Sequence, residues 1–226
     1  MNLIPPLRRS LQMTLKMLVV LTGFSSVLGS QQINWVTCPT DQSNGSIYLK
    51  ECAYLSYPLN REDPSLGNVT AFLRRSYYYS TPTEDSCWLV AGGPGDSTHP
   101  FVIQADYMLM MDPSLTIYTL DQRGTGLSSL MTCDNQPSGY FNPYNESMLR
   151  LYDECIQQIM HKYGNVTQYY STYHGAMDLK ETIDAVSPAT VRIYALSAGT
   201  FHFNTYLQLD GARADVVVFD GPGTQC

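Results

Sequence analysis

Short apolar runs alternate with longer amphipathic stretches along most of the chain. Two strand-like segments, residues 47–59 and 69–79, flank a turn-rich stretch and predict a hairpin. Beyond them, continuous apolar runs alternate with segments whose apolar residues recur at helical spacing. The runs predict strands at 87–91, 115–120, 191–195 and 215–219, and the periodic segments predict helices at 101–111, 144–163, 173–186 and 198–209.

This alternation indicates the fold class. Strands that read as unbroken apolar runs are typical of parallel sheets buried on both faces. Alternation of such strands with helices predicts an α/β fold, with a mostly parallel sheet and helices on both faces. A length of 226 residues, with 44% hydrophobic and 15% charged residues, suits one domain with a sizeable core.

The N-terminus has the layout of a secretory signal. Three basic residues precede the apolar run 17–27, and the small residues Gly29 and Ser30 follow it. The run is shorter than the roughly 20 residues that span a bilayer. We therefore expect a signal peptide at 1–30, a mature domain at 31–226, and a secreted or secretory-lumen protein without stable membrane insertion. The alternative is an uncleaved signal anchor.

Cysteines and sequons agree with export. An even count of 6 cysteines, all beyond the signal, favours disulfides. The preferred pairs close short loops, Cys38 with Cys52 and Cys133 with Cys155. Cys87 and Cys226 are then free, paired with each other, or paired with something absent, and spacing does not decide. Sequons for N-glycosylation occur at Asn44, Asn68, Asn145 and Asn165.

Charge excludes some partners. The net charge is −7 and the cations are scattered, which argues against nucleic acid or an anionic membrane surface. No cysteine or histidine cluster has the spacing of a metal site, and no cofactor motif is present. Oligomeric state is not indicated.

Three strand ends carry candidate chemistry. Ser197 lies between a predicted strand and a predicted helix, with the small residues Ala195 and Gly199 on either side, as in a nucleophile elbow of the GxSxG type. Alanine in place of the first glycine departs from that pattern but keeps the position small. The other interpretation of Ser197 is an ordinary helix cap.

Two glycine-rich loops follow other predicted strands. The loop Gly92, Gly93, Pro94, Gly95 has few side chains, so its backbone N–H groups can approach a ligand. An oxyanion hole in an α/β-hydrolase uses one N–H from such a loop and one from the residue after the nucleophile, which makes Gly93 and Ala198 the candidates. The supporting segment contains Asp121, Arg123, Gly124 and Gly126. Here the glycines permit a sharp turn that Arg123 can brace by pairing with a carboxylate.

Taken together, GGPG, DQRGTGLS and the small-x-Ser-x-Gly elbow, in this order, resemble the prolyl and tripeptidyl aminopeptidase group of α/β-hydrolases. The resemblance runs from about Cys38 to Pro222, and Cys133 and Cys155 look like the secreted branch of the group. It implies an α/β-hydrolase fold, Ser197 as nucleophile, and short peptides as substrates. It also implies oxyanion donors from the 92–95 loop and Ala198, with 121–126 as support.

One departure concerns the triad. In this fold the acid and then the histidine follow the serine. His202 is the only histidine after Ser197, and we expect it to be a partly buried helix residue. We interpret the sequence as a chain that stops before the segments that supply the lid, the acid and the base in this family, so that the activity of this chain alone is uncertain. Alternatives are an esterase that takes small esters, and a catalytically inert secreted binding protein of the same fold.

Overall fold

The computed structural model describes most of the predicted mature domain. The described residues are 33–38, 48–93, 95–134, 142, 144–186 and 188–221. The predicted signal peptide, Asn44, Pro94 and Cys226 lie outside them. No helix in these ranges is both long and apolar enough to cross a membrane.

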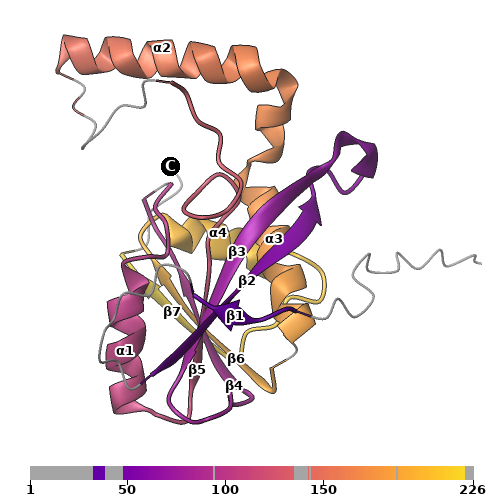
Figure 1. Ribbon diagram of the computed structural model, residues 1–226, viewed down its shortest axis with the longest axis vertical. Coiled ribbons are helices and arrows are strands. Elements are labelled where there is room, and N and C mark those ends of the chain that lie inside the picture. The colour runs from indigo at the N-terminus through magenta and orange to yellow at the C-terminus, as the bar shows by residue number, and fades with distance from the viewer. Residues whose placement is uncertain are drawn as a thin grey trace, which may run out of the picture.

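A mixed sheet forms the centre of the molecule (Figure 1). Its order is β1-β2-β3-β5-β4-β6-β7. The first three strands and β5 pair antiparallel, whereas β5, β4, β6 and β7 run parallel. The strands are β1 Val36–Thr37, β2 Leu49–Pro58, β3 Asn68–Tyr77, β4 Asp85–Val90, β5 Thr116–Leu120, β6 Thr190–Leu196 and β7 Val216–Asp220.

Helices cover both faces of this sheet. Helix α1 (Phe101–Met111) packs on one face, where its residues meet Cys87 and Leu89 of β4. Helices α3 (Thr172–Val186) and α4 (Gly199–Leu207) pack on the other face, against Trp88 and Val90 of the same strand. Alternate residues of β4 therefore serve two cores, as a strand buried on both faces requires. The predicted α/β class is confirmed.

The predicted elements match the observed ones closely, and three short ones were not foreseen. Helix α1 has the predicted bounds, and the other predicted helices and strands overlap their counterparts. The additional elements are the two-residue strand β1 and two 3-10 helices, η1 (Pro64–Leu66) and η2 (Gly164–Tyr169). Each is too short to carry a periodic apolar pattern, which is why the sequence did not reveal it.

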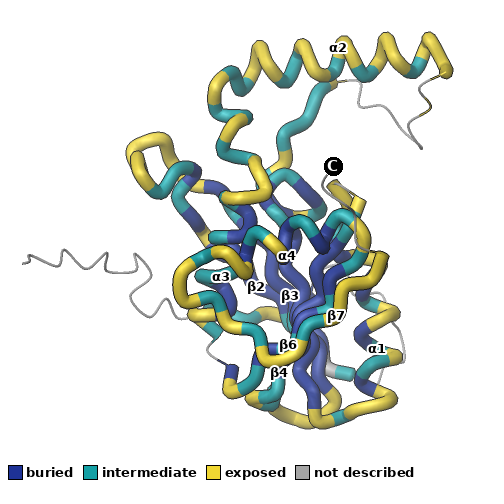
Figure 2. Tube along the Cα trace, turned by 180° about the vertical axis from the view of Figure 1, so that it is seen from behind, coloured by how far each residue is buried: buried dark blue, intermediate teal, exposed yellow. Residues whose placement is uncertain are grey.

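Helix α2 (Glu146–Tyr163) differs from the other helices. It stands apart from the sheet in Figures 1 and 2, and none of its residues is buried. Asn145 caps its N-terminus, and a Cys133–Cys155 disulfide ties it to the preceding loop. A Cys38–Cys52 disulfide holds the segment before β2, so both predicted pairs are formed. Cys87 is a buried free thiol.

Candidate functional site

Ser197 lies on a sharp turn between β6 and α4. Strand β6 ends at Leu196 and α4 begins at Gly199, so only two residues reverse the direction of the chain. Among the described residues other than glycine, Ser197 is the one with positive φ, at 50°. The residue is exposed. A non-glycine residue in this region is strained, and such strain gathers at functional sites.

The positions flanking Ser197 have little room. A Cβ atom added to Gly199 would lie 2.5 Å from the carbonyl oxygen of Val90 and 2.6 Å from that of Ala91. Both contacts are with backbone, which cannot move aside easily. Ala195 is fully buried in β6, yet its methyl group fits there. The turn therefore requires glycine on the helix side and accepts alanine on the strand side.

The glycine loop after β4 approaches the turn closely. A Cβ atom on Gly92 would lie 2.8 Å from the carbonyl oxygen of Leu196, 3.0 Å from Ser197 Cβ and 3.4 Å from the backbone nitrogen of Ala198. Gly93 is exposed and has φ of 106°. Thus Gly92 is the residue in contact with the turn, and Gly93, the candidate donor, is the next residue along the loop.

Asp121 joins the loop after β5 to the segment before α1. Its Oδ1 accepts hydrogen bonds from the backbone nitrogen and hydroxyl of Thr98, both at 2.7 Å. Its Oδ2 accepts one from the backbone nitrogen of Leu127, at 2.8 Å. A Cβ atom on Gly126 would overlap this carboxylate, at 2.0 Å from Oδ2. Asp121 is buried and ties the segment before α1 to the loop after β5.

Arg123 braces the same loop from its other side. Its guanidinium donates two hydrogen bonds to Asp178, with Nε to Oδ2 at 2.8 Å and NH2 to Oδ1 at 2.7 Å. It also donates to the carbonyl oxygens of Leu59 and Tyr169. Arg61 reaches the same Asp178 carboxylate at 2.7 Å. The loop is thereby fixed to the residue after β2, to η2 and to α3 at once.

Sequence reasoning did not identify Asp178 as the partner of Arg123. A signal was present, because Asp178 lies among the buried α3 residues Gly175, Leu179 and Thr182. A carboxylate on the apolar side of a helix must be paired. The sequence did not say with which cation, since Arg123 lies 55 residues away.

Strand β7 supports the turn from the side opposite to Gly92. The backbone nitrogen of Ser197 donates a hydrogen bond of 2.7 Å to the carbonyl oxygen of Asp220, the last residue of β7. The carboxylate of Asp220 accepts a hydrogen bond from the hydroxyl of Tyr194 in β6. The side chain of Asp220 is thus engaged beside the elbow.

The histidines of the chain lie in other settings. His202 is 4% exposed, more buried than expected, and its ring packs on α3, where a Cβ on Gly175 would lie 2.6 Å from Cε1. Burial lowers the pKa of His202 to about 4, against the opposing influence of Asp178. His174 Nδ1 lies 2.9 Å from the hydroxyl of Ser171. His99 and His161 are exposed, on the loop before α1 and on α2.

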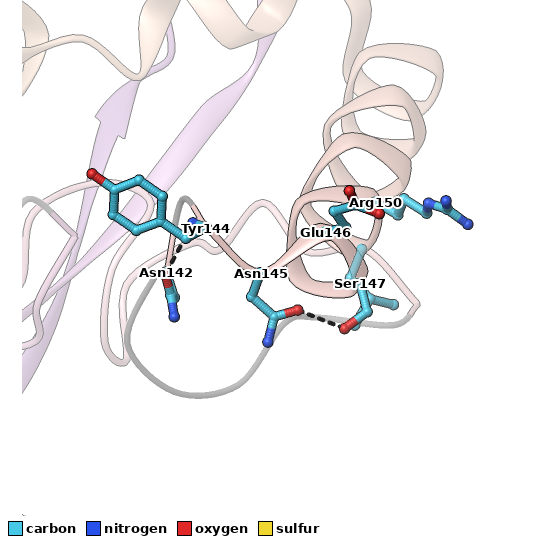
Figure 3. A pocket seen from close by; sticks show the side chains of 7 residues that line it. Asn142, Tyr144, Asn145, Glu146, Ser147 and Arg150 are labelled. Atoms are coloured by element: carbon cyan, nitrogen blue, oxygen red, sulfur yellow. Dashed lines mark hydrogen bonds between the residues drawn. The ribbon is translucent and has the colours of Figure 1, made fainter.

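The remaining predicted site residues lie on the surface. Asn68, Asn145 and Asn165 are exposed, at the start of β3, before α2 and in η2. An open hollow of about 840 Å³ lies at the N-terminus of α2 and includes Asn145 (Figure 3). No residue of the elbow or of the glycine loop lines this hollow.

Comparison with known proteins gives a partial likeness in structure. No protein-family model matches the chain, and no curated protein matches it. Among solved structures, an esterase from Exiguobacterium antarcticum has 14% identity and a TM-score of 0.43, over 67% of this chain and 41% of that one. A cold-adapted esterase from an Arctic intertidal metagenomic library has 13% identity and a TM-score of 0.46, over 83% and 65%.

A third solved structure is a proline iminopeptidase-related protein from Thermus thermophilus, with 13% identity and a TM-score of 0.42 over 74% of this chain and 44% of that one. The chain thus spans between 41% and 65% of these three proteins. The fold assignment rests on the molecule itself. A mostly parallel sheet with helices on both faces, and a serine on a strained turn between β6 and α4, are the features of an α/β-hydrolase fold.

Proposed function

We propose that the chain carries the nucleophile of an exported serine hydrolase, an aminopeptidase that acts on short peptides. The observation that carries the proposal is the backbone of Ser197, an exposed residue with a positive φ of 50°. Strain of this kind persists only where the surrounding structure imposes it. Here Gly92 approaches the turn closely, and the carbonyl oxygen of Asp220 accepts a hydrogen bond from the backbone nitrogen of Ser197.

The chemistry follows from the groups around the hydroxyl. Ser197 Oγ attacks the carbonyl carbon of the substrate while a base accepts its proton, and the leaving amine departs when that proton is returned to it. Backbone N–H groups of Gly93 and Ala198 donate to the developing oxyanion. Water then hydrolyses the acyl-enzyme. Peptides rather than esters as substrates are inferred from the sequence resemblance.

The base and the acid are proposed to come from a further segment of a longer polypeptide. His202 points into the α3 contact, and His174 is engaged with Ser171. Neither arrangement directs an imidazole at Ser197. A serine hydroxyl without a base is a weak nucleophile, so the chain by itself is expected to react slowly.

The test is labelling with a fluorophosphonate probe, applied to the secreted product of the longest reading frame that contains this chain. We expect labelling in the wild type and none in Ser197→Ala. Ser171→Ala is the matched control, because it removes a serine that contacts a histidine away from the elbow, and labelling should persist. An unlabelled wild-type product would overturn the proposal. Rates on matched ester and anilide substrates then separate an esterase from a peptidase.

A second candidate, an inert binding protein, is favoured because His202 packs on α3 and His174 is engaged with Ser171. It predicts a stable monomeric secreted protein that binds peptide, with an affinity that is unchanged by Ser197→Ala. The probe experiment distinguishes the two functions directly.

A further inference from the structure

The N-cap of α2 combines two properties in one asparagine. Asn145 is exposed and is the first residue of an Asn-Glu-Ser sequon. Its side-chain Oδ1 accepts a hydrogen bond from the backbone nitrogen of Met148 at 3.2 Å, which caps the helix. The same oxygen accepts the hydroxyl of Ser147 at 2.7 Å.

These two contacts fix the orientation of the amide. Both donors lie on the helix side, so the oxygen faces the helix and the nitrogen faces away from it, as Figure 3 shows. Nδ2 is the atom that N-glycosylation modifies, and the amide oxygen keeps its acceptor lone pairs after that modification. The cap and a glycan are therefore compatible on this residue.

The surroundings leave room for a sugar. Asn145 lines the open hollow of about 840 Å³. Apart from Leu151, its other lining residues have polar or aromatic side chains that suit a carbohydrate: Asn142, Tyr144, Glu146, Ser147 and Arg150. Tyr144 is 93% exposed. No residue of the sheet core is needed to make this space.

We propose that Asn145 carries an N-linked glycan while its amide oxygen caps α2, with the first N-acetylglucosamine in this hollow. In the reaction Nδ2 attacks the anomeric carbon of a lipid-diphosphate-linked oligosaccharide. The new bond joins nitrogen to carbon, the bond from that carbon to the diphosphate oxygen breaks, the lipid diphosphate leaves, and one amide proton is lost to a base.

The other sequons have different surroundings. At Asn165 the hydroxyl of Thr167 is engaged with the carbonyl oxygen of Gly164 at 3.0 Å, inside the 3-10 helix η2. Asn68 begins β3 and lies opposite Pro58 in the β2 ladder. Only at Asn145, among these described sequons, does the asparagine side chain cap a long helix.

Peptide mapping can isolate each site. Cleavage after arginine and lysine places Asn145 in peptide 124–150 and Asn165 in peptide 163–180. The chain is to be expressed in, and secreted from, a cell that performs N-glycosylation. An amidase then removes the glycans in heavy-oxygen water, so that each asparagine that carried a glycan receives a heavy-oxygen mark. We expect the mark in peptide 124–150. An unmarked Asn145 in the secreted protein would overturn the proposal.

Three variants distinguish the loss of the glycan from the loss of the helix cap. Ser147→Ala and Asn145→Asp each remove the sequon but keep an oxygen that can accept from the Met148 nitrogen, whereas Asn145→Gln removes both functions. All three should lose the mass of one glycan. Only Asn145→Gln should also show severalfold faster tryptic cleavage after Arg150, compared with the enzymatically deglycosylated wild type. Equal cleavage of Asn145→Asp and Asn145→Gln would show that the oxygen does not cap the helix.

Discussion

The serine turn and helix α2 show two opposite ways of holding a segment in place. Around Ser197, buried backbone and glycines leave no space for an extra methyl group. Helix α2 has no buried residue, and it is held by a cap, a disulfide and its connection to η2. The turn is fixed by packing, the loop after β5 by paired buried charge, and α2 by local bonds. Changes at the turn should therefore alter global stability, whereas changes in α2 should act locally.

The largest effect is expected from Asp178→Ala. The change leaves the guanidinium groups of Arg123 and Arg61 without their shared carboxylate, which is 1% exposed. An uncompensated buried charge costs about 3–5 kcal/mol. Urea unfolding followed by circular dichroism measures this loss.

Asp184→Ala is the matched control for that measurement. Asp184 pairs with Lys180 on the surface of the same helix, and such pairs contribute about 0.3–0.5 kcal/mol. If the two variants lost equal stability, the buried network would not be what fixes the loop.

Gly199→Ala is expected to have the next largest effect. Its methyl group would enter a space bounded by two carbonyl oxygens at 2.5 and 2.6 Å, and overpacking of this kind costs about 1–3 kcal/mol or more. Gly164→Ala, at the end of α2, meets nothing within 4 Å but has φ of 53°. With ψ of −131° this backbone lies outside the left-handed helical region, and alanine rarely adopts it. The strain of about 1–3 kcal/mol acts at the end of α2, which has no buried residue, so the global unfolding free energy should change less than in Gly199→Ala. If Gly164→Ala had the lower denaturant midpoint of the two variants, the contrast between the serine turn and α2 would be wrong.

His202 should give the core a pH dependence. Its pKa is lowered to about 4 in the folded protein and is near 6.5 when unfolded. The unfolded state therefore binds a proton first as pH falls, so stability is full above pH 6.5 and is lost progressively toward pH 4. At pH 5 the loss is about 2 kcal/mol.

Comparison of His202→Gln with the wild type isolates this contribution. Unfolding free energies at pH 7 and pH 5 should differ less in the variant, because glutamine does not titrate. Asp178 is the charged group on α3 that acts on His202, and it remains in both proteins. An unchanged pH dependence would mean that His202 is not the group responsible.

The smallest global effect is expected from removing the α2 disulfide. Replacing Cys133 and Cys155 by serine frees a helix without buried residues, so the global unfolding free energy should change by less than about 1 kcal/mol. Cleavage within 134–163 by a protease should become much faster, since local opening governs it. Replacing Cys38 and Cys52, both buried, should by contrast lower global stability by about 2–4 kcal/mol.

The sequence was most informative where a pattern is local. Helix α1 and the strands around the elbow follow from apolar spacing, and the small residues at Ala195 and Gly199 mark the turn itself. The order of the strands was not predictable, because β4 lies between β5 and β6 for reasons of packing across the whole sheet. The same limit applies to the site, where Asp178, Gly175 and Asp220 reach Arg123, His202 and Ser197 through long-range contacts.

The reactivity of the Cys87 thiol depends on whether the core of the sheet is open or closed. The thiol lies in β4 beneath α1, and burial raises its pKa to about 11. A thiol with such a pKa hardly forms thiolate at neutral pH, so alkylating reagents and oxidants react with it very slowly while the core is closed. Once the strands separate, the sulfur becomes an ordinary reactive nucleophile. The rate of its alkylation therefore reports how often the core of the sheet opens.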